Sequence, residues 1–451
     1  MSRTFRNVLV VCVIVMLVAG LACTPRSEPP TTTQPEAVPP IPLLPAEDTT
    51  PIFAPPEDLK ALAEGNNQFA IDLYKKLAEK SDGNIFFSPY SIRTALGMTY
   101  AGARGETAEQ MAKTLHFTLP AEKLHPAFGA TAQQLKGNTK NPPEPTIRSK
   151  SDHKFVLPTM EPFQLTVANA LWGQQGLPFQ REFLDVTKTN YASGFRELDF
   201  AGDTEGSRKT INRWVEEKTK NKIKELLKPD DLSSVTRLVL TNATHFKAAW
   251  AIPFLKGETR DALFEITADE KVTVAMMQTQ DAHFDYFATD DCEWVKLPYC
   301  DRASMLLLLP RKGKLAVVEG KLTPLFIQEA LGNIGPRTGK VLLPKFQVRT
   351  TAQLNTDLSR LGMPVAFSGN ADFSGMVPGG GFKIGSVIHE AYVNVDEVGT
   401  EAAAATAVMM NLSNPAPFSF TANRPFLFFI CDNKTESILF SGRVVRPTQT
   451  P

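Results

Sequence analysis

The sequence is poor in the residues from which catalytic and metal sites are built. Its 451 residues include 6 histidines and 5 cysteines, and no cluster of them has the spacing of a metal-ligand set. Lysine plus arginine (48) equals aspartate plus glutamate (48), so the formal net charge is zero. No basic excess points to nucleic acid, and no acidic excess points to a solvated tail. We expect no metal, no cofactor and no nucleic-acid partner.

Common catalytic motifs are missing as well. There is no G-x-S-x-G segment, and His389-Glu390 lacks the second histidine of a zinc-protease helix. The stretch 335–340 resembles a phosphate-binding loop, but its glycine spacing is one residue short and Val341 replaces the required serine or threonine. We therefore expect that the protein is not an enzyme.

The N-terminus has the layout of a secretory signal over residues 1–22. Two arginines precede the apolar run Val8–Val18, which is too short for a membrane span, and small residues follow it up to Ala22. Cleavage there would leave Cys23 first, as in a bacterial lipoprotein whose cysteine carries lipid, although Gly20 stands where leucine is usual. We expect an exported protein, either secreted or anchored to the cell envelope through Cys23.

Residues 23–57 are rich in proline, with eleven prolines among threonine, glutamate and alanine. Such a composition favours an extended linker of roughly 100 Å at about 3 Å per residue. Three cysteines follow it, Cys292, Cys300 and Cys431, without a disulfide-framework pattern. A Cys292–Cys300 bridge and free, mostly buried thiols are the alternatives, and we favour free thiols.

Residues 58–451 read as one α+β domain, with helices early and strands later. Apolar residues at helical spacing predict helices over 59–77 and 211–227, and Thr107 with Gln110 predicts a capping box. The predicted strands are Arg237–Phe246, Ser304–Leu309, Val341–Val348, Val387–Val395, Pro425–Cys431 and Ser437–Val444. Residues 137–160, with several prolines, look like a surface insertion.

The most informative segment is 397–414, which follows a predicted strand. From Thr400 onward alternate residues are small or apolar, Glu401 is the only charged residue, and no proline occurs from Gly399 to Asn414. Alanine favours helix, but the alternation also permits a strand buried among other strands. The segment can thus exist either as an exposed loop or as a central strand.

This segment resembles the hinge of inhibitory serpins, a family of serine protease inhibitors. Three other regions resemble the family's motifs in the same order, and we identify the chain as a member on these grounds. They are Asn84–Ile92 beneath the opening sheet, Thr241–Trp250 in its central strand, and the C-terminal pair Asn423–Phe428 and Ser441–Val444.

The resemblance implies a serpin fold with three β-sheets, about eight or nine helices and an exposed reactive-centre loop. A protease would cut the loop and form an acyl-enzyme, and the hinge would then enter the central sheet as a new strand and trap the protease. The implied hinge residues are Glu397, Gly399, Thr400, Glu401, Ala402, Ala403, Ala404, Ala405 and Thr406. The resemblance also implies a hydrogen-bonded group that controls opening of the sheet, called the shutter, formed by Ser88, Ser91, Asn242 and His389. Trp250 would lie at the breach, the place where insertion of the hinge starts.

The family's loop length places the cut bond at Ser413–Asn414, or one residue later when counted back from Pro425. Leu412 and Met410 are alternatives for the residue that fills the protease pocket. No lysine or arginine occurs from Thr400 to Asn423, so a trypsin-like pocket would be poorly filled. We expect a monomer that forms a covalent 1:1 complex with an elastase-like or chymotrypsin-like protease. A non-inhibitory serpin acting as carrier, chaperone or structural protein is the alternative.

Overall fold

The computed structural model describes residues 50–136, 163–192, 194–400 and 417–448. The expected lipid site at Cys23, the insertion 137–160, hinge residues 401–406 and the cut-bond residues Met410, Leu412, Ser413 and Asn414 lie outside these ranges. No helix in the described ranges is long and apolar enough to cross a membrane.

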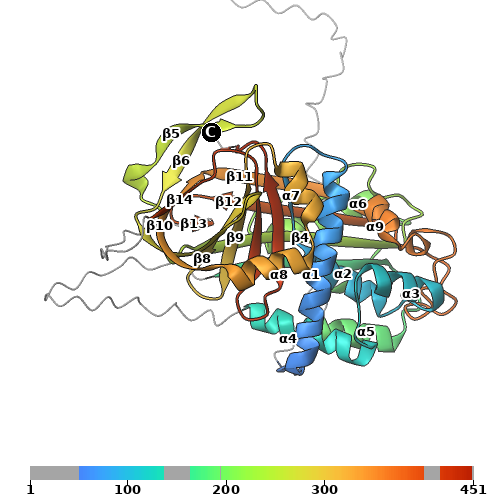
Figure 1. Cartoon of the computed structure of the whole chain (residues 1–451). Coiled ribbons are helices and arrows are strands. Elements are labelled where there is room, and N and C mark those ends of the chain that lie inside the picture. The colour runs from blue at the N-terminus through green and yellow to red at the C-terminus, as the bar shows by residue number, and fades with distance from the viewer. Residues whose placement is uncertain (1–49, 137–162, 193, 401–416, 449–451) are drawn as a thin grey trace, which may run out of the picture. The chain divides into compact units, whose positions relative to one another are not determined.

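The described residues form nine α-helices, two short 3₁₀ turns and sixteen strands (Figure 1). The helices are α1 (Pro56–Ala78), α2 (Pro89–Tyr100), α3 (Gly105–Thr114), α4 (Ala121–Lys136), α5 (Arg181–Asn190), α6 (Thr204–Lys218), α7 (Leu315–Lys321), α8 (Pro324–Asn333) and α9 (Asn355–Leu361). The strands are β1 (Ile85–Phe87), β2 (Gln164–Gln174), β3 (Phe195–Leu198), β4 (Leu238–Ala249), β5 (Arg260–Glu265), β6 (Lys271–Gln278), β7 (Ala282–Ala288), β8 (Cys292–Pro298), β9 (Ala303–Pro310), β10 (Gly335–Pro344), β11 (Phe346–Gln353), β12 (Ser386–Val395), β13 (Gly399–Thr400), β14 (Phe418–Thr421), β15 (Phe426–Asp432) and β16 (Ile438–Val444).

A six-stranded sheet, in the order β11-β12-β13-β4-β2-β3, carries the candidate site. Its central strand β4 contains no glycine or proline and is buried at every residue except the partly buried Lys247. β4 pairs antiparallel with β2 on one side and parallel with β12 on the other. Because β4 and β12 are parallel and paired directly, another strand could enter between them without changing their direction.

The other strands form one ten-stranded sheet that includes β14. Within it β10 pairs with β7 through Gly335–Gly339 and with β6 through Leu342–Pro344. Two of the three expected sheets are therefore continuous through β10 in the described residues.

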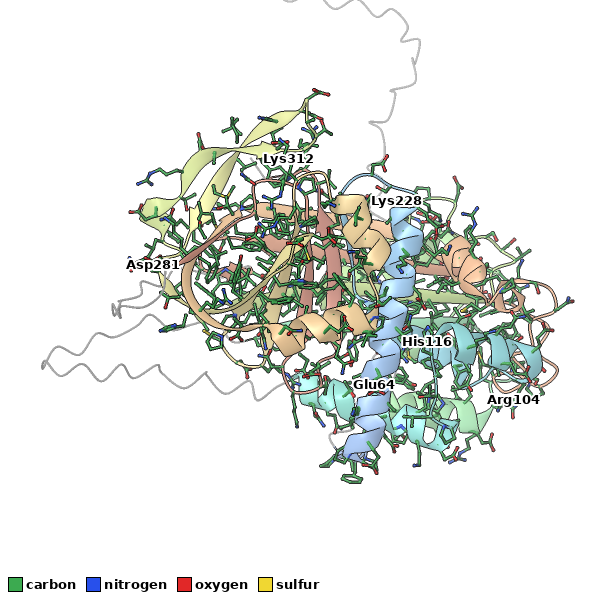
Figure 2. All side chains as sticks on the ribbon, viewed as in Figure 1. Glu64, Arg104, His116, Lys228, Asp281 and Lys312 are labelled. Atoms are coloured by element: carbon green, nitrogen blue, oxygen red, sulfur yellow. The ribbon has the colours of Figure 1, made fainter. Side chains whose placement is uncertain are left out.

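Helices pack against both sheets and share a large apolar core with them. α1 contacts α2, α4, α8, α9 and β16, and α2 contacts both β2 and β4 from beneath the six-stranded sheet. α2 begins at Ser88-Pro89: the Ser88 side chain caps the helix by accepting from the Ser91 N–H, and proline suits the first turn. Figure 2 shows His116 beside α1, where its Nε2 lies 2.7 Å from Asp72 Oδ2.

The predicted helix over 211–227 is wrong beyond residue 218. α6 ends at Lys218, and the chain then turns through positive φ at Lys220, Asn221 and Glu225. Side chains hold this segment in place of helical hydrogen bonds: Asn212 both donates to the Leu227 carbonyl and accepts from its N–H. Burial of Ile223, Leu226 and Leu227 produced a helix-like spacing without a helix.

Two further local predictions are wrong. The strand predicted over Val341–Val348 is two strands in different sheets, β10 ending at Pro344 and β11 starting at Phe346. The capping box is absent from α3, whose flanking residue is Arg104, and the Thr107 hydroxyl instead accepts from the Asp372 N–H. The other predicted strands, and the first helix, are confirmed to within a few residues.

The packed domain begins before the expected boundary at residue 58. α1 starts at Pro56, Ala54 is buried in the core, and the Ile52 N–H donates to Gln133 on α4. Cys292, Cys300 and Cys431 are free thiols, and Cys292 is fully buried. Burial raises the pKa of the Cys431 thiol to about 12, so this thiol stays protonated near neutral pH.

Candidate functional site

The candidate site is the boundary between β4 and β12, which we call the seam. At its open end the two strands are separated by β13, and in its closed part they pair directly with each other. At the open end β13 lies between them, with Gly399 opposite Ala249 and Thr400 opposite Ala248. Thr400 also pairs with Val395 on β12. Below this point β12 pairs directly with β4, from Ser386–Val239 to Tyr392–His245. The first two residues of the predicted hinge strand therefore already belong to the sheet.

A tight turn feeds the chain from β12 into β13. The partly buried Asp396 carboxylate accepts from the N–H groups of Val398 (2.9 Å) and Gly399 (3.2 Å), and the Asp396 N–H donates to the Gly399 carbonyl at 2.9 Å. A side chain at Gly399 would put its Cβ 2.1 Å from the Ala248 carbonyl oxygen. Only glycine lets the turn approach β4 this closely.

Trp250 and Tyr299 form an aromatic platform at the open end. Their rings stack at 4.3 Å with an interplanar angle of 10°, and both residues are almost completely buried. The Trp250 indole N–H donates to the Asp396 carbonyl at 3.0 Å, and the Tyr299 hydroxyl lies 2.9 Å from Thr400 Oγ1. The platform thus binds both ends of the turn, which gives Trp250 a role beyond core packing.

Glu397 holds the turn through a partly buried ion pair. Lys345 donates from Nζ to Glu397 Oε2 at 3.0 Å, and the Thr259 hydroxyl donates to Oε1 at 2.8 Å. Burial alone would raise the pKa of this carboxyl, but the hydrogen bonds from Lys345 and Thr259 hold it below its usual value. Glu397 is therefore ionised at neutral pH and stays paired with Lys345.

Beneath the closed seam a buried polar network joins α2 to β12 and β4. The Ser88 N–H donates to His389 Nε2 at 3.2 Å, which leaves the ring proton on Nδ1 to bond with Asn242 Oδ1. Ser88 Oγ also donates to the Leu439 carbonyl at 2.7 Å. Burial lowers the pKa of His389 to about 3, so the imidazole is neutral and the network carries no net charge.

The same network continues across β4 to β2. Asn242 Nδ2 donates to Ser91 Oγ at 2.6 Å and to Asn169 Oδ1 at 2.5 Å, and Asn169 Nδ2 donates to the Ser91 carbonyl at 3.0 Å. Asn169 lies directly opposite Asn242 in the β2–β4 register. α2 therefore holds both sides of the seam, β12 through Ser88 and β4 through Ser91.

The structure brings together all five predicted shutter and breach residues in two groups. Ser88, Ser91, Asn242 and His389 share the network, and Trp250 lies at the open end. Among the hinge residues, Gly399 and Thr400 form β13 and Glu397 lies in the turn before it. Sequence reasoning missed Asn169, Lys345 and Tyr299. Only Asn169 left a signal, as an amide between two alanines in a strand.

The geometry suits strand insertion and shows no catalytic arrangement among these residues. The buried imidazole bonds to an amide and a backbone N–H rather than to a nucleophile. In the described ranges no group of three His, Cys, Asp or Glu side chains is placed to hold a metal ion.

The sequence matches the family described as serpin (serine protease inhibitor) over residues 64–447. An uncharacterized serpin-like protein of Thermococcus kodakarensis is 39% identical over 393 residues, which covers 86% of each chain. The leukocyte elastase inhibitor of Xenopus tropicalis is 37% identical over 398 residues, covering 86% of this chain and all of that protein. The crystal structure of human thyroxine-binding globulin with thyroxine aligns with a TM-score of 0.75 and 31% identity, over 87% of this chain and 100% of the other.

The chain belongs to the serpin family and has the α+β serpin fold. The family is named for inhibition of serine proteases. The relatives include a protein named as a leukocyte elastase inhibitor and a solved structure of a protein named as a thyroxine-binding globulin. Family membership alone therefore leaves both an inhibitor and a carrier open for this chain.

Proposed function

We propose that the protein is a suicide-substrate inhibitor of a serine protease. The observation that carries this proposal is β13: Gly399 and Thr400 already occupy the gap between β4 and β12, in register with both neighbours. The residues that follow are small or apolar at alternate positions from Ala402 onward. After cleavage the hinge would extend this two-residue strand down the seam and draw the acylated protease with it.

Strand insertion can supply the driving force. Thr400 to Ser413 is fourteen residues, which span roughly 46 Å as a strand at about 3.3 Å each. With a net gain of about 0.5–1.5 kcal/mol for each newly paired residue, insertion yields on the order of 10 kcal/mol. That equals the whole stability of an ordinary domain, about 5–15 kcal/mol. The uncut form is then metastable and persists because opening is slow.

The expected target has a small or apolar specificity pocket. The cut bond would be Ser413–Asn414 or its neighbour, and Ser413, Leu412 or Met410 would fill an elastase-like or chymotrypsin-like pocket. With no cation from Thr400 to Asn423, a trypsin-like pocket would leave its buried acid unpaired. The N-terminal pattern supports action outside the cell, as a monomer that is either secreted or held at the envelope through Cys23.

The direct test is to mix the protein with elastase, chymotrypsin or trypsin and to separate the products on a denaturing gel. We expect a band at the summed mass with elastase and chymotrypsin, and none with trypsin. Simple cleavage by every protease would contradict trapping and favour the non-inhibitory alternative. A stable trypsin complex formed at this loop would overturn the order of targets.

Two charge variants separate insertion from simple loop binding. Thr400→Arg buries a guanidinium at the first inserted position, so it should convert inhibitor into substrate. Glu401→Arg places the same group one residue later, on the opposite face by strand alternation, and should retain the complex band. If Thr400→Arg traps elastase as efficiently as the wild type does, insertion is not the mechanism.

A further inference from the structure

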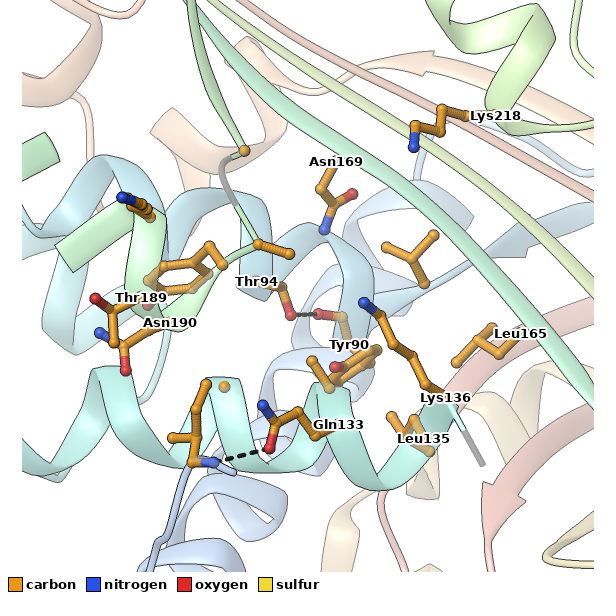
Figure 3. A pocket seen from close by; sticks show the side chains of 18 of the residues that line it. Tyr90, Thr94, Gln133, Leu135, Lys136, Leu165, Asn169, Thr189, Asn190 and Lys218 are labelled. Atoms are coloured by element: carbon orange, nitrogen blue, oxygen red, sulfur yellow. Dashed lines mark hydrogen bonds between the residues drawn. The ribbon is translucent and has the colours of Figure 1, made fainter. Parts of the chain in front are cut away.

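Residues 50–55, which we call the strap, join the proline-rich segment to α1 and contact α4. The side chain of Gln133 on α4 holds the strap by two hydrogen bonds. Its Oε1 accepts from the Ile52 N–H at 2.8 Å, and its Nε2 donates to the Thr50 carbonyl at 2.8 Å. Figure 3 shows Gln133 and its hydrogen bond to the strap. One side-chain amide thus pairs with the strap as the backbone of a neighbouring strand would.

Buried and exposed side chains alternate along the strap. Ile52 packs against the core, and a Cβ at Gly129 on α4 would lie 2.7 Å from its Cδ1. Ala54 is buried. Phe53 between them is 81% exposed, the largest exposed fraction of any large apolar residue in the described ranges. The alternation is typical of extended backbone, so the Phe53 ring points away from the domain.

Prolines limit where a protease can cut between the leader and the domain. A bond that precedes proline is cut poorly by chymotrypsin-like proteases, since proline has no N–H and its ring crowds the bond. Prolines 51, 55 and 56 exclude three of the six bonds in 50–56 in this way. The Phe53–Ala54 bond is not excluded, and Phe53 is the only aromatic residue in 23–57. Its ring suits the hydrophobic specificity pocket of a chymotrypsin-like protease.

The backbone at this bond is free to enter a protease cleft once the strap leaves α4. In the described ranges neither Phe53 nor Ala54 makes a backbone hydrogen bond. The other exposed large apolar residues differ from Phe53, because Leu263 lies in β5 and Val317 and Leu325 lie in helices. The remaining one, Val235, is β-branched and fills an aromatic-type pocket poorly.

We propose that the Phe53–Ala54 bond is a release site, where a chymotrypsin-like protease separates the leader from the domain, and that Gln133 limits the rate of the cut. Water adds across the peptide bond, which leaves a carboxylate on Phe53 and an amine on Ala54. A domain held through its leader is freed by this cut. The release site includes no residue of the hinge or the seam, so it is independent of protease trapping.

The control by Gln133 follows from what the protease must do to reach the bond. Ile52 and Ala54 face the domain, so the strap has to leave α4 before the protease can bind the chain on both sides of the bond. Opening leaves α1 intact, because that helix begins only at Pro56. When the strap closes faster than the protease cuts, the cleavage rate follows the fraction of open strap. The two hydrogen bonds of Gln133 lower that fraction.

The direct test is to treat the intact protein with a small molar excess of chymotrypsin and to measure the masses of the products over time. The excess leaves active protease even after 1:1 trapping. We expect an early product that begins at Ala54. A cut in the reactive loop changes only the C-terminal fragment, so the two cuts are told apart by mass. If the leader stays attached while the loop is cut, or is first cut at another bond, the release site is refuted.

Two substitutions at Phe53 separate recognition of this side chain from general access to the strap. Phe53→Arg should abolish the chymotrypsin cut and create a trypsin cut at the same bond, because the trypsin pocket accepts a cation. Phe53→Asp should prevent cleavage by both proteases. Since the Phe53 side chain is exposed, both variants should keep the thermal transition of the wild type. Failure of trypsin to cut Phe53→Arg at residue 53 would show that the bond is inaccessible and would overturn the proposal.

A matched pair on α4 tests the control by Gln133. Gln133→Ala removes both hydrogen bonds to the strap and should raise the initial rate of the chymotrypsin cut at least about threefold. Gln134→Ala is the control, because the Gln134 Oε1 atom has no hydrogen-bond partner in the described ranges and the side chain makes no bond to the strap. Equal rates for the two variants would remove Gln133 from the proposal.

The purpose of the cut is measured on the product. After removal of the leader, residues 54–451 should form the elastase complex as efficiently as the uncut protein, because the hinge and the seam are unchanged. Loss of the complex after the strap cut alone would mean that the cut inactivates the domain, which contradicts release. Absence of the complex before the cut as well would refute the proposed function, whereas the masses of the chymotrypsin products would still decide the release site.

Discussion

The hydroxyl of Tyr299 lies 2.9 Å from the hydroxyl of Thr400, and both residues are buried at the open end of the six-stranded sheet. Tyr299 follows β8 and Thr400 ends β13, so this contact joins the ten-stranded sheet to the start of the hinge. The contact helps to hold the register of β13 between β4 and β12. An inserting strand would therefore extend an existing register and would not have to find one.

Tyr299→Phe and Thr400→Val should each lower the free energy of the first unfolding step of the intact protein in urea by about 1 kcal/mol or more. The reason is that each variant leaves a buried hydroxyl without its partner. The ring of Phe can still stack on Trp250. The double variant should recover part of the loss, since both partners are then apolar. A double-mutant cycle in which the two effects simply add would show that the contact carries no energy.

His389 should make the closed sheet sensitive to acid. Burial lowers its pKa to about 3, whereas an imidazole in the unfolded chain has a pKa near 6.5. Between these values the unfolded chain binds a proton that the folded protein excludes, so the free energy of unfolding falls as the pH drops from about 6.5 toward 3. For these two pKa values the loss between pH 7 and pH 5 is about 2 kcal/mol.

The check is the urea midpoint of the first transition at pH 7 and pH 5. His389→Asn removes the titrating group, so its midpoint should fall less over this interval than that of the wild type. His125 adds a loss of nearly the same size in both proteins, because burial lowers its pKa to about 4, which also lies below this interval. If the urea midpoints of the variant and the wild type fall by the same amount between pH 7 and pH 5, His389 is not the source of the acid sensitivity.

Asn169 should control how readily the sheet opens. Asn169→Ala removes three hydrogen bonds with Ser91 and Asn242, leaves buried polar atoms unpaired, and should cost about 1–3 kcal/mol. The intact protein should then lose inhibitory activity faster on warming. Asn333→Ala is a suitable control because it removes an amide–carbonyl bond on the surface, at a cost within about 0.5 kcal/mol. Equal half-lives for the two variants would exclude Asn169 from the shutter.

Contiguous motifs made much of this site predictable from sequence. Ser88, Ser91, Asn242 and His389 lie in stretches that resemble serpin motifs, and the structure places them in one network. Tyr299 and Lys345 were missed because their partners, Thr400 and Glu397, lie far away in sequence. A single tyrosine after a strand and a single lysine after a proline carry no local signal of such contacts.

The failed predictions also have a physical cause. Apolar spacing reports which residues are buried and not which backbone hydrogen bonds they make, so the buried residues of 219–227 resembled a helix. Pro344 marks the point where the chain passes from one sheet to the other, but the apolar residues on both sides read as one strand. Tertiary hydrogen bonds, such as that of Thr107 with Asp372, likewise override a local capping pattern.

The proposed function depends on a gain in stability after loop cleavage. A protease that cuts between Met410 and Ala416 should raise the melting temperature by on the order of 10–20 °C, given an insertion gain of on the order of 10 kcal/mol. Calorimetry of intact and cleaved protein measures the shift. Cleaved Thr400→Arg is the control and should gain much less, because its first inserted residue is a buried charge. If cleavage leaves the wild-type midpoint unchanged, the hinge does not enter the seam beyond Thr400.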